Sequence, residues 1–259
     1  MSEHTVPSVP TQSDPTVSSS WTRARLIEPS TAGFVHVGAS SGPWRLPLPL
    51  PRAGRRSILT HMHAAATTLR SDPRIVRADV FRGLLRPPGR SPHSAGRDVP
   101  DANFDAILLV ETTTVADAAD LPGEAILRRL VDDLPETAAR TLVFAGSNAR
   151  RIGPVDHDRQ GVFLFNYFSA DTVEANLFAW QYTAGWFQDE TGLDNSTVLQ
   201  PVAAADAPYS LVNHCRWDRL RDVVPALLFK RSFRSFVLRV FGENGVAPRP
   251  ILYRLDDRG

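Results

Sequence analysis

A polar residue interrupts an apolar, aromatic run in the second half of the chain, where it could do chemistry. Asn166 lies within GVFLFNYFS, and a buried amide without hydrogen-bond partners destabilises a fold by about 1–3 kcal/mol. Its NH₂ group is suited to hold an anionic oxygen as a preorganised donor. The alternative is that Asn166 bonds only a neighbouring loop backbone. We carry it forward as a candidate catalytic residue.

A second group of polar residues lies in the later run SLVNHCRW. Because side chains alternate along a strand, His214 and Arg216 share one face, while Asn213, Cys215 and Trp217 share the other. If the first pair faces a cavity, His214 is placed to accept a phenolic proton as general base and Arg216 to hold the resulting anion. The alternative puts both on a solvated or interface edge.

Aromatic residues near these positions could form the wall of a pocket for a flat ligand. Trp180 lies on the apolar stripe of a predicted helix, which favours a core residue, whereas Tyr182 and Trp186 lie off that stripe and are better candidates for a cleft or an interface. With Tyr167 beside Asn166, and Trp217, they make up the predicted substrate-binding set.

Metal and nucleotide chemistry have little support in the sequence. His61 and His63 are two residues apart on a predicted helix and point to different sides, and no carboxylate and histidine cluster has ligand-like spacing. No phosphate-binding Gly-rich loop, nucleophile elbow or dinucleotide fingerprint occurs. We therefore expect no metal and no cofactor.

Two similar successions of elements position these residues. The first predicts strands at 33–39, 75–85, 104–111 and 141–145, with helices at 56–70 and 122–134. The second predicts strands at 161–169, 197–202, 210–217 and 251–255, with helices at 172–190 and 223–241. Both read β, α, β, β, α, β.

This order predicts an α+β fold in which two tandem ferredoxin-like βαββαβ units close into one pseudo-dimeric barrel. A lone four-stranded sheet would leave one face bare, and face-to-face packing buries both sheets. We expect a disordered tail over residues 1–22, which are rich in Ser, Thr and Pro. The first unit then spans residues 23–150 and the second 151–259.

Composition limits the partners. The 29 Lys and Arg nearly balance the 28 Asp and Glu, so nothing indicates nucleic-acid or membrane binding, and we expect a small apolar or aromatic ligand. The single cysteine and the absence of an apolar span or a secretory signal predict a cytoplasmic protein. The fused pair could still form a homodimer.

The second half also resembles the antibiotic-biosynthesis monooxygenase superfamily of dimeric α+β barrels. The likeness rests on Asn166 in the first strand and on NHCRWDRLRDV, where Trp217 ends a strand just before a helix. The first half resembles the superfamily in topology only, with Glu111 in the place of the Trp.

The resemblance implies a small-molecule tailoring enzyme, above all a cofactor-independent monooxygenase acting on an aromatic or polyketide-like substrate, in a pocket between the sheet and helices of the second half. A non-catalytic binding or scaffold barrel is a second hypothesis. Haem binding through His36, which we place loosely equivalent to Asn166, or through His61 or His214 is a third. The haem-degrading branch uses a His near the end of the second helix, and residues 223–241 contain none.

Overall fold

The computed structural model describes residues 21–44, 46–49, 53–87, 101–134, 138–203 and 207–257. In the first unit the elements are β1 (Gly33–Ser40), α1 (Ala53–Leu69), β2 (Ile75–Leu85), β3 (Ala106–Thr112), α2 (Val115–Asp120), the 3₁₀ turn η2 (Leu121–Gly123), α3 (Ala125–Asp132) and β4 (Arg140–Gly153). In the second they are β5 (Val162–Ser169), α4 (Val173–Thr191), β6 (Ser196–Pro201), β7 (Leu211–Trp217), α5 (Leu220–Phe229), the π-helix η4 (Phe233–Leu238), α6 (Arg239–Glu243) and β8 (Ala247–Leu255).

The strands form a closed antiparallel barrel in the order β1-β3-β2-β8-β5-β7-β6-β4. Within each unit the first and third strands are central. The units join where β2 pairs with β8 and β4 pairs with β6, so the second strand of each unit meets the last strand of the other. The predicted tandem ferredoxin-like α+β barrel is confirmed.

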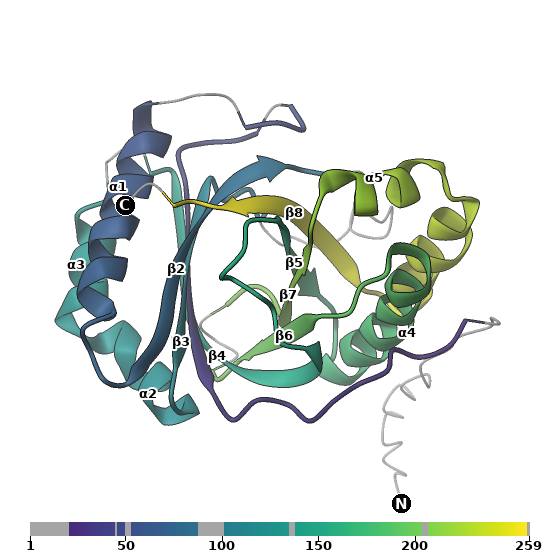
Figure 1. Ribbon diagram of the computed structural model, residues 1–259, viewed down its shortest axis with the longest axis horizontal. Helices are drawn as coiled ribbons and strands as arrows, with labels where there is room; N and C mark the ends of the chain where they lie inside the picture. Colours follow the sequence, from purple (N-terminus) through teal and green to yellow (C-terminus); the bar gives the residue numbers. More distant parts are fainter. Residues whose placement is uncertain are drawn as a thin grey trace, which may run out of the picture.

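Helices cover the barrel on two opposite sides (Figure 1), with α1, α2 and α3 on one side and α4 to α6 on the other. Each helical layer packs on the outer face of its own sheet, which gives two outer cores. A third core fills the barrel and is largely aromatic. Its aromatic members are Phe34, Trp44, Phe81, Phe104, Phe144, Phe163, Phe165, Tyr167, Tyr209 and Tyr253.

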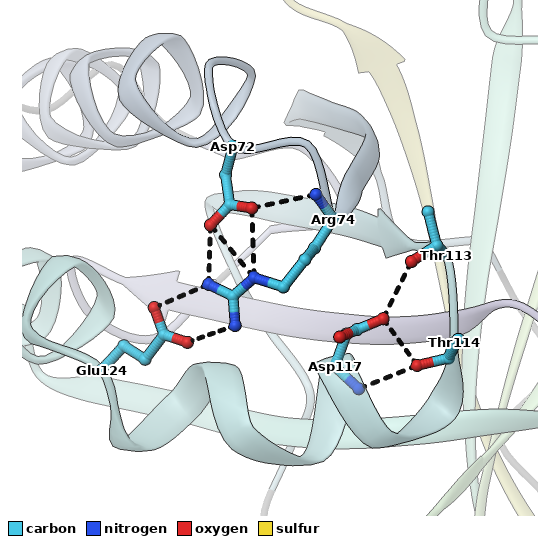
Figure 2. Close-up of polar contacts among 6 residues, drawn as sticks. All are labelled: Asp72, Arg74, Thr113, Thr114, Asp117 and Glu124. Carbon is cyan, nitrogen blue, oxygen red and sulfur yellow. Dashed lines mark hydrogen bonds and ion pairs between the residues drawn. The ribbon is translucent and has the colours of Figure 1, made fainter.

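A network of short polar contacts fixes one end of the first unit (Figure 2). The Arg74 guanidinium donates to Asp72 and to Glu124, at 2.6 and 2.7 Å for the shortest contacts, and so joins the turn before β2 to the start of α3. Beside it, the Thr114 hydroxyl accepts from the backbone N–H of Asp117 at 3.1 Å and caps α2. The cap marks the N-terminus of α2, a short helix that the sequence periodicity did not predict.

The structure differs from the expected elements at three other places. β4 continues to Gly153, well past the expected 141–145, because its second half pairs with β6 and belongs to the barrel closure. The expected helix 223–241 is broken at Lys230, whose backbone is extended, and resumes as η4 and α6. The expected boundary between residues 150 and 151 therefore falls inside β4, which pairs with β1 of the first unit and with β6 of the second.

An N-terminal segment, residues 21–28, crosses from the first unit to the helices of the second (Figure 1). The backbone N–H of Ala24 donates to the carbonyl of Gln181 at 2.8 Å, and the Trp21 ring stacks on Phe236 with 5.7 Å between centroids. Trp21 and Thr22 were expected to belong to the tail and are instead packed on α4 and η4. Residues 1–20 of that expected tail lie outside the described residues.

Candidate functional site

Two small adjoining hollows lie between the second sheet and the helices α4, α5 and η4. Their cavity volumes are about 40 and about 20 Å³. Five residues line both: Leu164, Asn166, Phe187, Trp217 and Phe241. The rest of the wall is almost entirely apolar, with Val223, Leu227 and Phe233 among its members. This is the place expected for the working pocket.

Asn166 is the polar group that this apolar wall leaves unsatisfied. It is 9% exposed, and its Oδ1 is buried without a hydrogen-bond partner in the described structure. Its neighbour across the strand pair is Asn213, whose Oδ1 accepts from Trp180 Nε1 at 3.0 Å and from Ser196 Oγ at 2.5 Å. Two amides therefore lie side by side, and one of them retains an acceptor for a ligand.

The outer wall of the hollows contains a π-helix, a conformation that is rare and frequent at functional sites. η4 follows the break at Lys230, whose ammonium group forms an ion pair with Glu190 of α4. The Trp186 Nε1 donates to Ser232 Oγ at 3.0 Å, which ties the start of η4 to α4. Two polar contacts therefore tie the start of this wall to α4, and the apolar side chains Phe233, Phe236 and Val237 pack in the core of the second unit.

The predicted aromatic set divides between several surroundings. Trp217 lines both hollows and donates to Thr191 Oγ1 at 3.0 Å, and Trp180 lines the smaller one. Tyr182 and Trp186 instead contact the N-terminal segment. Arg23 Nε donates to the Tyr182 hydroxyl at 3.0 Å, and Trp186 is wholly buried. In this arrangement neither of those two faces a hollow.

The side chains of Asn166 and His214 lie on opposite faces of the same sheet. Phe165, the neighbour of Asn166, pairs directly with His214, and the two rings stack inside the barrel with 4.1 Å between centroids. The side chain of Asn166 points to the helices. Asn166 therefore lines a different hollow from His214 and Arg216, because the sheet lies between them.

His214 is part of a buried chain of hydrogen bonds. Its Nε2 lies 2.8 Å from His157 Nε2, and His157 Nδ1 lies 2.7 Å from Asp79 Oδ2. The His214 Nδ1 is 3.3 Å from the carbonyl oxygen of Leu164. Burial, and secondarily the His157 ring, lowers the pKa of His214 well below its usual range. Both nitrogens of His214 are occupied, so His157 would have to turn away before His214 could take a proton from a substrate.

Asp79 and His157 were not identified from the sequence. His157 lies in the segment between β4 and β5, and Asp79 lies on β2, far from His214 along the chain. The only local signal is a histidine between two aspartates in the run DHD, which by itself is typical of a solvated loop.

Arg216 also faces the barrel side but points to the rim. Its Nη2 donates to the carbonyl of Gln160 at 2.8 Å, and its Nη1 pairs with Asp218 at 2.8 Å. It lines a separate hollow at the end of β7. An anion held by Arg216 would thus lie apart from the His214 ring.

Tyr167 and His36 meet in the centre of the barrel. Tyr167 Oη lies 2.9 Å from His36 Nε2, and both side chains are fully buried. Burial lowers the pKa of His36 to about 3 and raises that of Tyr167 well above its usual range. His36 therefore faces the opposite way from Asn166, which corrects the loose equivalence suggested by the sequence.

None of the histidines considered for haem lines the two helix-side hollows. His61 Nδ1 lies 2.8 Å from the carbonyl oxygen of Ser57 on α1, while His36 and His214 lie inside the barrel. In the described part of the chain, no group of three or more His, Cys, Asp or Glu is arranged to hold a metal ion. Within the same residues no helix is long and apolar enough to cross a membrane.

Comparison with known proteins gives likeness in structure only. No protein-family model matches the sequence, and no curated protein matches it significantly. A crystal structure of an anthrone oxidase-like protein matches 87% of this chain and 91% of its own, with a TM-score of 0.61 and 10% identity. A proposed monooxygenase from Fusobacterium nucleatum matches 86% of this chain and 91% of its own, with a TM-score of 0.50 and 6% identity.

At such low identity these likenesses establish the fold. They extend over both units, so the first unit, which matched by topology alone, is included. The chain has a dimeric α+β barrel fold, with both halves of the barrel in one polypeptide.

Proposed function

We propose that the chain is a cofactor-independent monooxygenase that oxidises an aromatic, polyketide-like molecule in the helix-side hollows. One observation carries the proposal: the buried, unpartnered Oδ1 of Asn166 in an otherwise apolar wall. A phenolic hydroxyl supplies the missing donor, and the amide NH₂ can donate to an enolate oxygen on the same ring system.

An anthrone illustrates the proposed reaction. The substrate loses a ring CH₂ proton to solvent and gives an enolate, whose oxygen accepts from the Asn166 NH₂. The carbanion carbon reacts with O₂, one oxygen atom becomes the new carbonyl, and the other leaves as water. The substrate supplies all four electrons, so the balance C₁₄H₁₀O + O₂ → C₁₄H₈O₂ + H₂O needs no external reductant. Stabilising the enolate is the chemistry that the amide contributes.

The lining residues limit this mechanism to acidic substrates. Among the described residues, Cys215 is the only ionisable side chain that lines the two hollows, and burial raises the pKa of its thiol. The described lining therefore offers no strong base, and the substrate itself must ionise readily. Anthrones and hydroquinones meet that condition, whereas simple alkanes and ethers do not.

Substrate entry requires the helical wall to move. Ligand pockets usually measure roughly 300–1,000 Å³, far more than the hollows contain. The break at Lys230 and the π-helix interrupt the regular helix of this wall, and η4 lines the larger of the two hollows together with Asn166. Outward movement of η4 would join the two hollows, since they already share Trp217 and Phe241.

The test is oxygen uptake with 9-anthrone as substrate. We expect wild type to consume O₂ above the uncatalysed rate and Asn166→Leu to lose about ten- to a hundredfold in kcat/KM, the effect of removing one hydrogen bond to a developing charge. Tyr182→Phe, outside the hollows, should keep wild-type activity. Equal rates for wild type and Asn166→Leu would contradict the proposal.

Non-catalytic binding in the same hollows is the second candidate, favoured by the lack of a base in the lining. It predicts that anthraquinone raises the melting temperature of wild type but not of Asn166→Leu, without any oxygen uptake. The His214→Gln variant tests whether the reaction takes place in the barrel interior instead. Loss of oxygen uptake in that variant alone would indicate that it does.

A further inference from the structure

A larger cavity opens at one end of the barrel, on the opposite side of the sheet from Asn166. Its volume is about 380 Å³, within the range of small-molecule pockets. Residues from both units and from the segment between them line it. They are Ser30, Phe34, Val76, Arg77, Leu109, Glu111, Arg151, Pro154, Val155, Asp156, His157, Asp158, Thr197, Leu199 and His214.

The inner part of this barrel-mouth cavity is apolar. Phe34, Leu109 and Leu199 belong to the aromatic core of the barrel and are nearly fully buried, and Val155 packs against that core from the connecting segment. A planar ring entering the cavity would rest against these four side chains. The polar residues lie around them, so a ligand with an apolar body and polar substituents fits best.

Most charges around the cavity already have partners. Asp156 pairs with Arg159 at 2.6 Å, and Asp158 pairs with Arg77 at 2.6 Å. These two carboxylates are therefore neutralised by arginines, and neither is free to repel an incoming anion at full strength.

The Asp79–His157–His214 chain forms the back of the cavity and is also satisfied internally. His157 uses one nitrogen for Asp79 and the other for His214, and Arg77 approaches Asp79 at 3.6 Å. His157 and His214 thus offer ring surface but no free N–H group to a ligand.

Two charged groups on the cavity wall, the Arg151 guanidinium and the Glu111 carboxylate, have polar atoms without a partner among the described residues. Arg151 Nε is buried and makes no hydrogen bond. The carboxylate of Glu111 makes no hydrogen bond or ion pair with any described residue, although its charge is felt by Arg77. A buried guanidinium N–H without an acceptor is costly, and the cost is relieved when a ligand supplies one.

We propose that the barrel mouth is a second small-molecule site, and that it takes a hydroxyaromatic carboxylate. The carboxylate binds the Arg151 guanidinium, the ring rests on Phe34, Leu109 and Leu199, and the phenolic hydroxyl donates to Glu111. Arginine binds carboxylates tightly because its planar N–H groups match the two carboxylate oxygens. Glu111 adds selectivity for hydroxylated ligands, since its carboxylate needs a hydrogen-bond donor at the end of the ring opposite the ligand's carboxylate.

The site does not depend on the proposed oxygenation, because no lining residue is shared with the helix-side hollows. A carboxylate would also be poorly received by those hollows, whose lining offers no cation. The two proposals can therefore fail separately.

The experiment is isothermal titration of the full chain with 4-hydroxybenzoate and with benzoate. We expect 4-hydroxybenzoate to bind about ten- to a hundredfold more tightly, the usual effect of a hydrogen bond to a charged group. Arg151→Gln should lose binding by a similar factor, and Glu111→Leu should make the two ligands bind equally. Arg151→Lys should give intermediate affinity, because it keeps the charge but not the planar fork.

The matched control is Arg25→Gln, which removes the same charge from an exposed arginine whose ion-pair partner, Asp189, also lies outside the cavity lining. It should bind 4-hydroxybenzoate like wild type, as should Asn166→Leu. Absence of binding to wild type, or equal weakening by Arg151→Gln and Arg25→Gln, would overturn the proposal. If Arg151→Gln is unfolded by circular dichroism, the Arg151→Lys and Glu111→Leu results decide the question.

Discussion

Asn166 and Asn213 are direct cross-strand partners on β5 and β7, yet only Asn213 has donors for its side-chain oxygen. The two residues have the same chemistry and nearly the same burial, 9% and 6% exposed. They differ in what surrounds them. Asn213 serves the protein, whereas Asn166 is left with an acceptor that faces the hollows.

This pair predicts opposite stability effects for one substitution. Asn166→Leu removes an unsatisfied buried amide and should raise the free energy of unfolding by about 1 kcal/mol. Asn213→Leu leaves the side-chain donors of Trp180 and Ser196 without an acceptor and should lower the free energy of unfolding by about 2 kcal/mol. Urea unfolding of both variants is the measurement, and destabilisation by Asn166→Leu equal to that of Asn213→Leu would show that Asn166 is a structural residue.

Acid should unfold the protein through its buried histidines. The pKa of His36 is lowered from 6.5 to about 3, so the unfolded chain binds a proton that the folded chain excludes. Stability is therefore full above about pH 6.5 and falls by about 1.4 kcal/mol per pH unit below it, down to about pH 3. His214 shifts in the same direction and adds to the slope.

The measurement is urea unfolding of wild type and His36→Phe at several values between pH 7 and about pH 5. The variant should show a shallower loss of stability, whatever its stability at neutral pH. Asp72, whose pKa is lowered to about 2 by its hydrogen bonds from Arg74, loses its contribution only below the usual carboxylate range and so outside this window. Identical slopes would contradict the burial of a neutral His36.

The Asp79–His157–His214 chain should have a defined hydrogen-bond direction between its two imidazole rings. With His214 neutral and its Nδ1–H directed at the Leu164 carbonyl, His214 Nε2 must accept from His157 Nε2. Nitrogen-15 NMR of the imidazoles would detect this arrangement directly. A protonated Nε2 on His214 would show that the segment carrying His157 is placed differently.

Removing the carboxylate of this chain should destabilise the barrel. Asp79→Asn replaces the charged partner of His157 Nδ1 with a neutral amide, and we expect the free energy of unfolding to fall by up to about 3 kcal/mol, measured by urea unfolding. The control is Asp158→Asn on the same side of the cavity. Asp158 is 80% exposed, so its loss should change stability by less than about 1 kcal/mol. Equal losses of stability in Asp79→Asn and Asp158→Asn would mean that the buried hydrogen-bond chain adds nothing to stability.

The N-terminal segment should be released by a single methyl group. A Cβ at Gly185 would overlap the backbone oxygen of Thr22, so Gly185→Ala should displace residues 21–28 from α4. Limited proteolysis should then cleave the segment faster than in wild type. Gly123→Ala is the matched control, because its added Cβ meets nothing and its proteolysis should be unchanged.

Local sequence patterns determined much of this protein. The repeated β, α, β, β, α, β order follows from periodicity, and it was sufficient to predict the paired units and the closed barrel. The opposite facing of His214 and Cys215 follows from strand alternation alone. The amide at position 166 stood out because an apolar strand has no local partner for it.

Only the tertiary structure decided which side of the sheet each candidate faces. A strand pattern gives two faces but does not say that Tyr167 and His214 point into the barrel while Asn166 points to the helices, since both faces of β5 are buried. Nor does it show that His157 and Asp79 meet His214, or that Arg151 Nε and the Glu111 carboxylate at the barrel mouth have no partner among the described residues. Those contacts join strands and a connecting segment far apart in sequence, and they exist only because the two sheets close on each other.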